Sequence, residues 1–205
     1  QNSLGGAIPA PLGNLANLRL LSLSNAQLTG DLPAWLGGLT KLERLALAGN
    51  QLMGVTPAEF ASLVNLVELT LNDNLLTGGI PGQWGYLAKL QKLSLAGNAI
   101  TGNIPVELGN LSSLQTLYLD RTLLNGELPA TLAQLSGIQV FWFHNTQLCV
   151  PSNPTLVNWL AAIPNVNSSG VNCVDLTPTV TPTVTPTNTP QPIGEMPVVN
   201  AIFPN

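Results

Sequence analysis

One block of residues recurs along this chain, and each copy begins 24 residues after the previous one. Its pattern is L-x-x-L-x-L-x-x-N-x-L-x-G-x-I-P, and the copies begin at Leu18, Leu42, Leu66, Leu90, Leu114 and Ile138. A fixed period in this range is typical of solenoids, in which each repeat is one unit that stacks on the next. A single unit cannot bury its own apolar side, so three or more are needed for a continuous core. The six copies therefore predict a solenoid.

Each copy predicts a strand, a turn and a return segment. In the strand, as at 66–71, Leu69 and Leu71 point to one face because side chains alternate. The turn is centred on a buried asparagine that bonds backbone groups of its own and the neighbouring coil. In the return, a glycine allows a bend and a proline then opens a short helical turn. The residues concerned are Asn50, Asn74 and Asn98 in the turns, with Gly30, Gly54, Gly78, Gly102, Gly126, Pro33, Pro57, Pro81, Pro105 and Pro129 in the returns.

Some repeats depart from this pattern at the asparagine position. Ala26, Thr122 and Thr146 stand there in the first, fifth and sixth units, which predicts a weaker turn network at both ends of the array. Residues 2–9 align with the middle of a repeat, and no polar cap precedes them. Because terminal repeats need a polar outer face, we expect that the sequence is a piece of a longer chain or lacks its cap.

Residues 2 to about 148 resemble the leucine-rich repeat family, specifically its 24-residue plant-type subclass with the motif L-x-G-x-[IL]-P. The resemblance implies a right-handed α/β solenoid arc. Its concave face would be a parallel β-sheet, and its convex side would carry short strands and 3₁₀ or short helical turns. Related plant receptors and polygalacturonase inhibitors use this frame to bind proteins, peptides or glycans, so the resemblance implies such a ligand here.

The solenoid is expected to span 1–148 and to be followed by a cap at 149–175. Cys149 and Cys173 flank this cap, and a disulfide between them would close a loop of about 24 residues, worth about 3 kcal/mol. Two free thiols or metal ligation are the alternatives, although two cysteines and one histidine make a poor zinc set. An amphipathic helix is expected to cover the open end of the core. Its apolar residues are Leu156, Val157, Trp159, Leu160 and Ile163.

The composition changes after the cap. Residues 176–192 are a Thr-Pro repeat, which favours extended polyproline II geometry and predicts a semi-rigid linker. This segment resembles the linkers of secreted bacterial proteins. Residues 193–205 are mildly apolar and are either a tail or the start of a further domain.

Charged residues make up only 8% of the chain, against about 25% in an average domain, and the net charge is −4. Six scattered basic residues disfavour a nucleic-acid partner. No apolar run reaches the roughly 20 residues that span a bilayer, so no membrane insertion is expected. A disulfide would place the protein in an oxidising compartment, either extracellular or at the cell surface. The sequence presents no cofactor motif and no metal-ligand set.

Equivalent residues of stacked strands form columns, which can be read from the sequence. The first four units present small side chains, whereas the last two present aromatic and charged ones of the types enriched at binding hot spots. The candidate ligand-binding residues are Asn72, Asp73, Tyr118, Asp120, Arg121, Trp142 and His144. The alternative is that Trp142, with Phe141 and Phe143, only thickens the end of the solenoid where the cap docks.

Two charge patterns on this face have structural explanations. Asp120 and His144 are column neighbours and are expected to form a hydrogen-bonded surface pair. No nucleophile completes a catalytic set, since Ser94 lies two coils from His144. Arg44, Glu68 and Lys92 alternate in sign on adjacent strands and predict cross-strand ion pairs.

These features favour a monomeric, non-catalytic recognition module for a protein, peptide or glycan. One alternative is a surface scaffold or ice-binding solenoid, because Thr29, Thr77 and Thr101 share a column, although Met53 and Asn125 break it. The other is a targeting module of a larger secreted enzyme.

Overall fold

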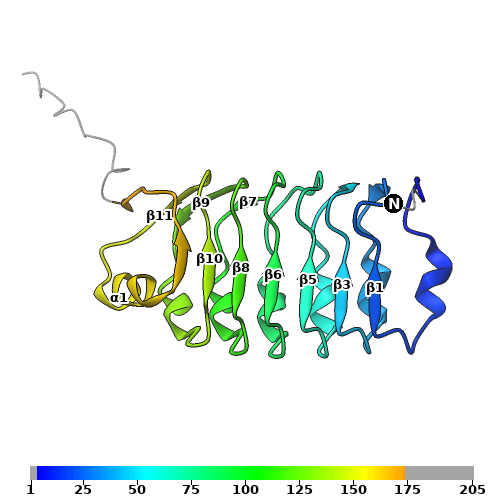
Figure 1. Cartoon of the computed structure of the whole chain (residues 1–205), viewed down its shortest axis with the longest axis horizontal. Helices are drawn as coiled ribbons and strands as arrows, with labels where there is room; N and C mark the ends of the chain where they lie inside the picture. Colours follow the sequence, from blue (N-terminus) through cyan, green and yellow to red (C-terminus); the bar gives the residue numbers. More distant parts are fainter. Residues whose placement is uncertain (1–3, 174–205) are drawn as a thin grey trace, which may run out of the picture.

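The computed structural model describes residues 4–173. Within them the chain winds into a row of stacked coils, with strands side by side on one face, helical turns behind them and α1 at one end (Figure 1). The predicted linker at 176–192 and the segment at 193–205 lie outside the described residues, as do the last two residues of the predicted cap.

The main sheet has seven strands, all paired in parallel in the order β1-β3-β5-β6-β8-β10-β12. Six of them come one from each repeat: β1 (Leu20–Ser22), β3 (Arg44–Ala46), β5 (Glu68–Thr70), β6 (Lys92–Ser94), β8 (Thr116–Tyr118) and β10 (Val140–Trp142). Leu45 pairs with Leu69 and Leu69 with Leu93, so neighbouring repeats stack in the register that the 24-residue period predicts. The predicted columns are therefore confirmed.

The seventh strand, β12 (Asn165–Asn167), belongs to the cap and pairs with β10. The sequence did not predict this strand, because Asn165-Val166-Asn167 lies outside the repeat and lacks its leucines. The main sheet thus continues past the last repeat.

The opposite side carries 3₁₀ turns and short strands. The turns are η1 (Ala10–Asn14), η2 (Ala34–Gly38), η3 (Ala58–Ser62), η4 (Gly82–Tyr86), η5 (Val106–Asn110) and η6 (Ala130–Gln134). The strands are β2 (Thr29–Asp31), β4 (Gln51–Met53), β7 (Thr101–Gly102), β9 (Leu123–Glu127) and β11 (Gln147–Cys149). Each predicted proline stands at the N-cap of its turn, and each predicted glycine has a positive φ, which explains why these residues recur.

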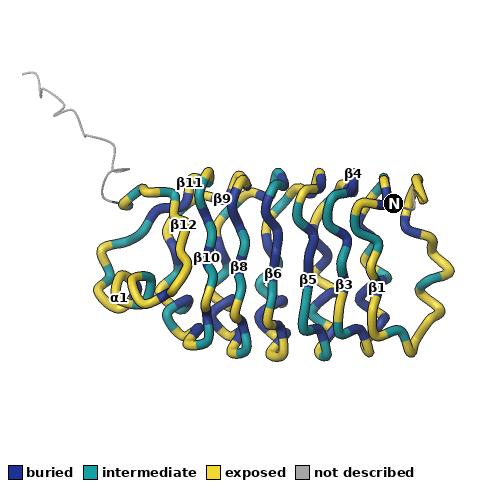
Figure 2. The backbone as a smooth tube through the Cα atoms, viewed as in Figure 1, coloured by how far each residue is buried: buried dark blue, intermediate teal, exposed yellow. Residues whose placement is uncertain are grey.

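The repeat leucines fill a core that runs through all coils, while exposed residues gather at the two ends (Figure 2). Phe60 and Trp84 replace leucines in two returns and stack on each other with ring centroids 6.1 Å apart. The Trp84 indole donates to the carbonyl of Pro57 at 2.9 Å, so this polar group is satisfied inside the core. At the first coil Leu4, Leu15 and Leu20 are exposed.

The predicted asparagine ladder is present. Asn74 accepts from the amide of Leu52 at 3.0 Å and donates to the carbonyls of Leu47, Leu71 and Asn72. Asn50 and Asn98 bond equivalent groups. Where threonine replaces asparagine, the hydroxyl of Thr122 donates only to the carbonyl of its own coil's Leu119. The ladder is weaker there because a hydroxyl has one hydrogen to donate, whereas the amide of asparagine donates to carbonyls of two coils.

The C-terminal cap is held by the predicted disulfide between Cys149 and Cys173. Its helix α1 (Pro154–Ala162) begins after Asn153, whose side chain accepts from two amides of the first turn. Residues Leu156, Trp159, Leu160 and Ile163 pack on the core at helical spacing. The prediction was wrong for Val157, which is 44% exposed because it lies about 100° around the helix from Leu156. None of the described helices is long and apolar enough to cross a membrane.

The threonines of the ice-binding alternative lie on the side opposite the main sheet. Thr29 lies in the two-stranded sheet β2–β4, Thr77 forms an isolated bridge with Val55, and Thr101 lies in the separate sheet β11–β9–β7. Backbone hydrogen bonds still join these coils, as from Thr77 to Gly54 at 2.8 Å and from Thr101 to Gly78 at 2.7 Å, but Met53 and Asn125 interrupt the threonine column.

Candidate ligand-binding site on the main sheet

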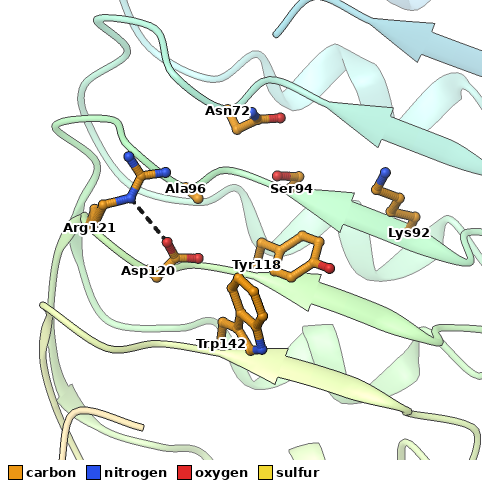
Figure 3. A pocket seen from close by; sticks show the side chains of 8 residues that line it. All are labelled: Asn72, Lys92, Ser94, Ala96, Tyr118, Asp120, Arg121 and Trp142. Atoms are coloured by element: carbon orange, nitrogen blue, oxygen red, sulfur yellow. Dashed lines mark hydrogen bonds and ion pairs between the residues drawn. The ribbon is translucent and has the colours of Figure 1, made fainter. Parts of the chain in front are cut away.

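The outward face of the main sheet has a hollow of about 240 Å³ over β6 and β8. Strand residues and the loops that follow them line it: Asn72, Lys92, Ser94, Ala96, Tyr118, Asp120, Arg121 and Trp142. Figure 3 shows the two aromatic rings at one side, Asn72 at the opposite side and Arg121 at the end where the strands finish.

The hollow exists because small side chains adjoin large ones in the same columns. Ser94 pairs with Tyr118 across β6 and β8, and Tyr118 with Trp142 across β8 and β10. Ser94 and Ala96 form a buried floor, each only 4% exposed, beside the aromatic rings. The step from serine to tyrosine in one column therefore opens space on the surface.

The aromatic side is formed by Tyr118 and Trp142, whose ring centroids lie 5.0 Å apart with planes at 66°. This edge-to-face arrangement is one that aromatic pairs prefer. The Trp142 indole donates to the side chain of Asn165 in β12 at 2.9 Å, so the cap strand orients the ring. Both rings remain partly exposed and lie toward the hollow.

The structure separates the residues of the aromatic cluster into buried and partly exposed ones. Phe141 and Phe143 are fully buried, and Phe141 lies 5.9 Å from the ring of Trp159 in the cap helix. Trp142 lies between them in β10 and points to the outward face. Alternation along the strand separates the core residues from the surface one.

Arg121 lies between two carboxylates at one end of the hollow. Its Nε donates to Oδ2 of Asp120 at 3.2 Å, and its Nη2 lies 3.2 Å from Oδ1 of Asp73. Asn72 donates to the other oxygen of Asp73 at 2.7 Å. The hydrogen bond with Asp120 and the charge of Asp73 raise the pKa of Arg121 above its ordinary value, although burial opposes them. The guanidinium is thus a permanent charge at this end.

The expectation of a hydrogen-bonded surface pair between Asp120 and His144 was wrong. Nε2 of His144 lies 3.9 Å from Oδ2 of Asp120, beyond hydrogen-bond distance. Asp120 is also buried, with 4% of its surface exposed, because its coil neighbours cover it. Among the described residues, Oδ1 of Asp120 and Nδ1 of His144 are buried without a hydrogen-bond partner.

The predicted cross-strand ion pairs lie toward the other end of the hollow. Glu68 lies 2.8 Å from Arg44 and 3.3 Å from Lys92, which confirms the alternation read from the sequence. Lys92 also lines the hollow. The carboxylate of Glu68 therefore forms ion pairs with two basic side chains there.

The structure brings together most of the predicted site residues. Asn72, Tyr118, Asp120, Arg121 and Trp142 line the hollow, while Asp73 and His144 adjoin the residues that line it. Sequence reasoning missed Lys92, Ser94 and Ala96, although the small residues beside Tyr118 and Trp142 in the same columns were a usable signal.

The groups that line the hollow are aromatic, charged and small polar side chains. Within residues 4–173 no three His, Cys, Asp or Glu side chains are grouped so as to hold a metal ion. Aromatic faces, a carboxylate and two basic groups around a shallow hollow are suited to binding.

Comparison with known proteins shows the family. A model described as Leucine rich repeat matches residues 16–76 and 65–124. Together these matches cover more than half of the chain, which belongs to the leucine-rich repeat family. No curated protein sequence matches it.

Several solved leucine-rich repeat structures are similar. The Arabidopsis receptor kinase HAESA, solved with the peptide hormone IDA and a co-receptor, is 32% identical with a TM-score of 0.76, over 82% of this chain and 28% of that one. The ectodomain of the Arabidopsis thaliana receptor kinase SOBIR1 is 30% identical with a TM-score of 0.61, over 65% of this chain and 72% of that one. A leucine-rich repeat protein of Leptospira interrogans is 31% identical with a TM-score of 0.67, over 84% of this chain and 42% of that one.

This chain spans only part of most of these proteins. It covers 25% of a plant peptide hormone receptor, solved with its peptide, to which it is 34% identical.

Proposed function

We propose that this chain is an extracellular recognition module that binds a peptide, or an extended segment of a protein, in the hollow on its main sheet. The observation that carries the proposal is the aromatic pair Tyr118 and Trp142 beside a small-residue floor, in columns where the earlier repeats present small side chains. Tyr and Trp are enriched at binding hot spots because they bury much area at low conformational cost.

The structural relatives support this choice of ligand. HAESA is solved with a peptide hormone, and a second receptor is described as a plant peptide hormone receptor in complex with its peptide. Receptor ectodomains among the relatives and the disulfide Cys149–Cys173 support an extracellular or cell-surface location.

Three finer assignments belong to the same proposal. The 24-residue period and the Gly-x-x-Pro returns support the plant-type subclass. The Leptospira relative and the Thr-Pro segment support a secreted bacterial-like protein. The hollow is complete within one chain, which supports action as a monomer, and its groups support binding without catalysis.

The test is a binding screen of immobilised protein against peptides, secreted proteins and glycans. Wild type is compared with the double variant Tyr118→Ala/Trp142→Ala and with the control Tyr86→Ala, which removes a 73% exposed tyrosine from the helical side. We expect a peptide or protein to bind wild type and the control but not the double variant, with similar melting temperatures for all three. Binding that survives in the double variant contradicts the proposed site. If only glycans bind wild type and the double variant loses that binding, the proposal that the ligand is a peptide or protein segment is contradicted.

A further inference from the structure

The charges around the hollow are arranged unequally at its two ends. Asp73 and Asp120 share one guanidinium, that of Arg121, so this end has one more negative than positive charge. At the other end Arg44 and Lys92 share Glu68, so one more positive than negative charge remains. Lys92 and Ala96 are four residues apart, so the two ends are separated by roughly 13 Å along the strand direction.

Asp120 is an unusual residue at the negative end. It is buried, yet its Oδ1 has no hydrogen-bond partner among the described residues. Buried polar groups in native proteins are nearly always bonded, and each exception calls for an explanation. Figure 3 shows one oxygen of Asp120 joined to Arg121 and the other directed away from it, toward the side of the aromatic rings.

The aromatic side of the hollow also favours positive charge. A cation placed over the face of Tyr or Trp is attracted by the ring quadrupole, and the attraction grows when water is excluded. Tyr118 and Trp142 both line the hollow next to Asp120. Aromatic faces and an incompletely bonded carboxylate therefore act on the same space.

The size of the hollow limits what can enter. A closed cavity of about 150 Å³ holds a benzene molecule, so a hollow of about 240 Å³ suits one long side chain and not a folded surface. The small floor residues Ser94 and Ala96 leave room for an aliphatic stem.

From these observations we infer that the hollow receives a lysine or arginine side chain of the bound peptide. Its charged group lies beside Asp120 and Asp73, and its methylene stem lies along Tyr118 and over Ala96. This inference rests on the proposed function, which it extends by naming the group that is recognised. Because Oδ1 of Asp120 is covered, direct contact with it requires a neighbouring side chain to shift. Without that contact, the combined negative charge of Asp120 and Asp73 still attracts the cationic group of the bound side chain.

The test uses three acetylated and amidated pentapeptides, Gly-Gly-X-Gly-Gly, in which X is arginine, its neutral isostere citrulline, or glutamate. Each is titrated into the ¹⁵N-labelled, disulfide-bonded full chain while the amides of Ser94, Ala96 and Gly97 are followed. We expect the arginine peptide to shift these amides with at least about tenfold higher affinity than citrulline, and the glutamate peptide to bind most weakly.

Two variants test whether the carboxylate of Asp120 causes the preference for arginine over citrulline. Asp120→Asn should remove the difference between arginine and citrulline, whereas Asp31→Asn, an equal charge change on the opposite side in β2, should leave it intact. If Asp120→Asn does not fold, Asp73→Asn replaces it, because Asp73 is exposed, and should reduce the difference.

The outcomes separate this inference from the proposed function. Equal binding of arginine and citrulline at the hollow, or tighter binding of glutamate, overturns the inference and leaves a peptide site in place. If none of the three peptides moves the amides of the hollow, the inference is overturned, and the binding screen with the Tyr118→Ala/Trp142→Ala variant decides the proposed function separately.

Discussion

The guanidinium of Arg121 lies 3.2 Å from a carboxylate oxygen of Asp73, a residue two coils earlier in the solenoid. The pair crosses the intervening coil at Gly97, where a Cβ would lie 2.5 Å from Asp73 Oδ1 and 3.5 Å from Arg121 Cζ. Both charged residues have positive φ angles, of 55° and 53°, which non-glycine residues rarely adopt. Gly97 thus provides the space that lets Arg121 reach both carboxylates.

The first prediction concerns this glycine. Gly97→Ala should lower the free energy of unfolding by about 1–3 kcal/mol, because its φ of 64° disfavours a side chain and the new Cβ overlaps Asp73. Gly102→Ala is the matched control, since its φ is also positive, at 80°, but no atom lies within 4 Å of the added Cβ. Urea denaturation measures both. Equal losses in the two variants would show that the Asp73–Arg121 contact does not depend on Gly97.

A second prediction concerns the asparagine ladder. Asn74→Ala should lower the free energy of unfolding by about 1–3 kcal/mol, because it leaves buried backbone groups of two coils unpaired. Asn110→Ala, at an exposed position on η5, should change it by less than about 0.5 kcal/mol. The denaturation midpoints measure this difference, and an unchanged midpoint for Asn74→Ala would contradict a structural role for the ladder.

A third prediction concerns the cap. The disulfide Cys149–Cys173 closes a loop with a sequence separation of 24, so its reduction should cost about 3 kcal/mol. Native protein should show no titratable thiol from these two cysteines, and reducing agent should lower the melting temperature. Two reactive thiols in the purified protein, or melting unaffected by reductant, would argue against the bond.

Much of the fold could be predicted because the 24-residue period sets both the number of strands and their register. Leu45, Leu69 and Leu93 pair as the period requires, and the prolines open the helical turns as expected. The strand β12 could not be predicted, because the short polar segment Asn165–Asn167 lies outside the repeat and lacks its leucines, yet pairs with β10.

The candidate site was predictable for a similar reason, and only in part. Reading columns placed Tyr118 and Trp142 side by side, since equivalent positions of adjacent repeats are neighbours. The burial of Asp120 and the contact of Arg121 with Asp73 depend on side chains packing across more than one coil. The repeat period predicts which positions are neighbours, but it does not predict which residues a long side chain contacts.

The central claim is that a ligand binds in the hollow beside Trp142, and the indole N–H signals of the full chain test it most directly. A peptide or protein from the screen is added to the ¹⁵N-labelled chain until it is saturated. We expect the Trp142 indole signal to shift, while that of Trp84, which is buried and bonded to Pro57 on the far side of the core, stays in place. A ligand that saturates the protein and leaves the Trp142 signal unmoved would contradict the claim.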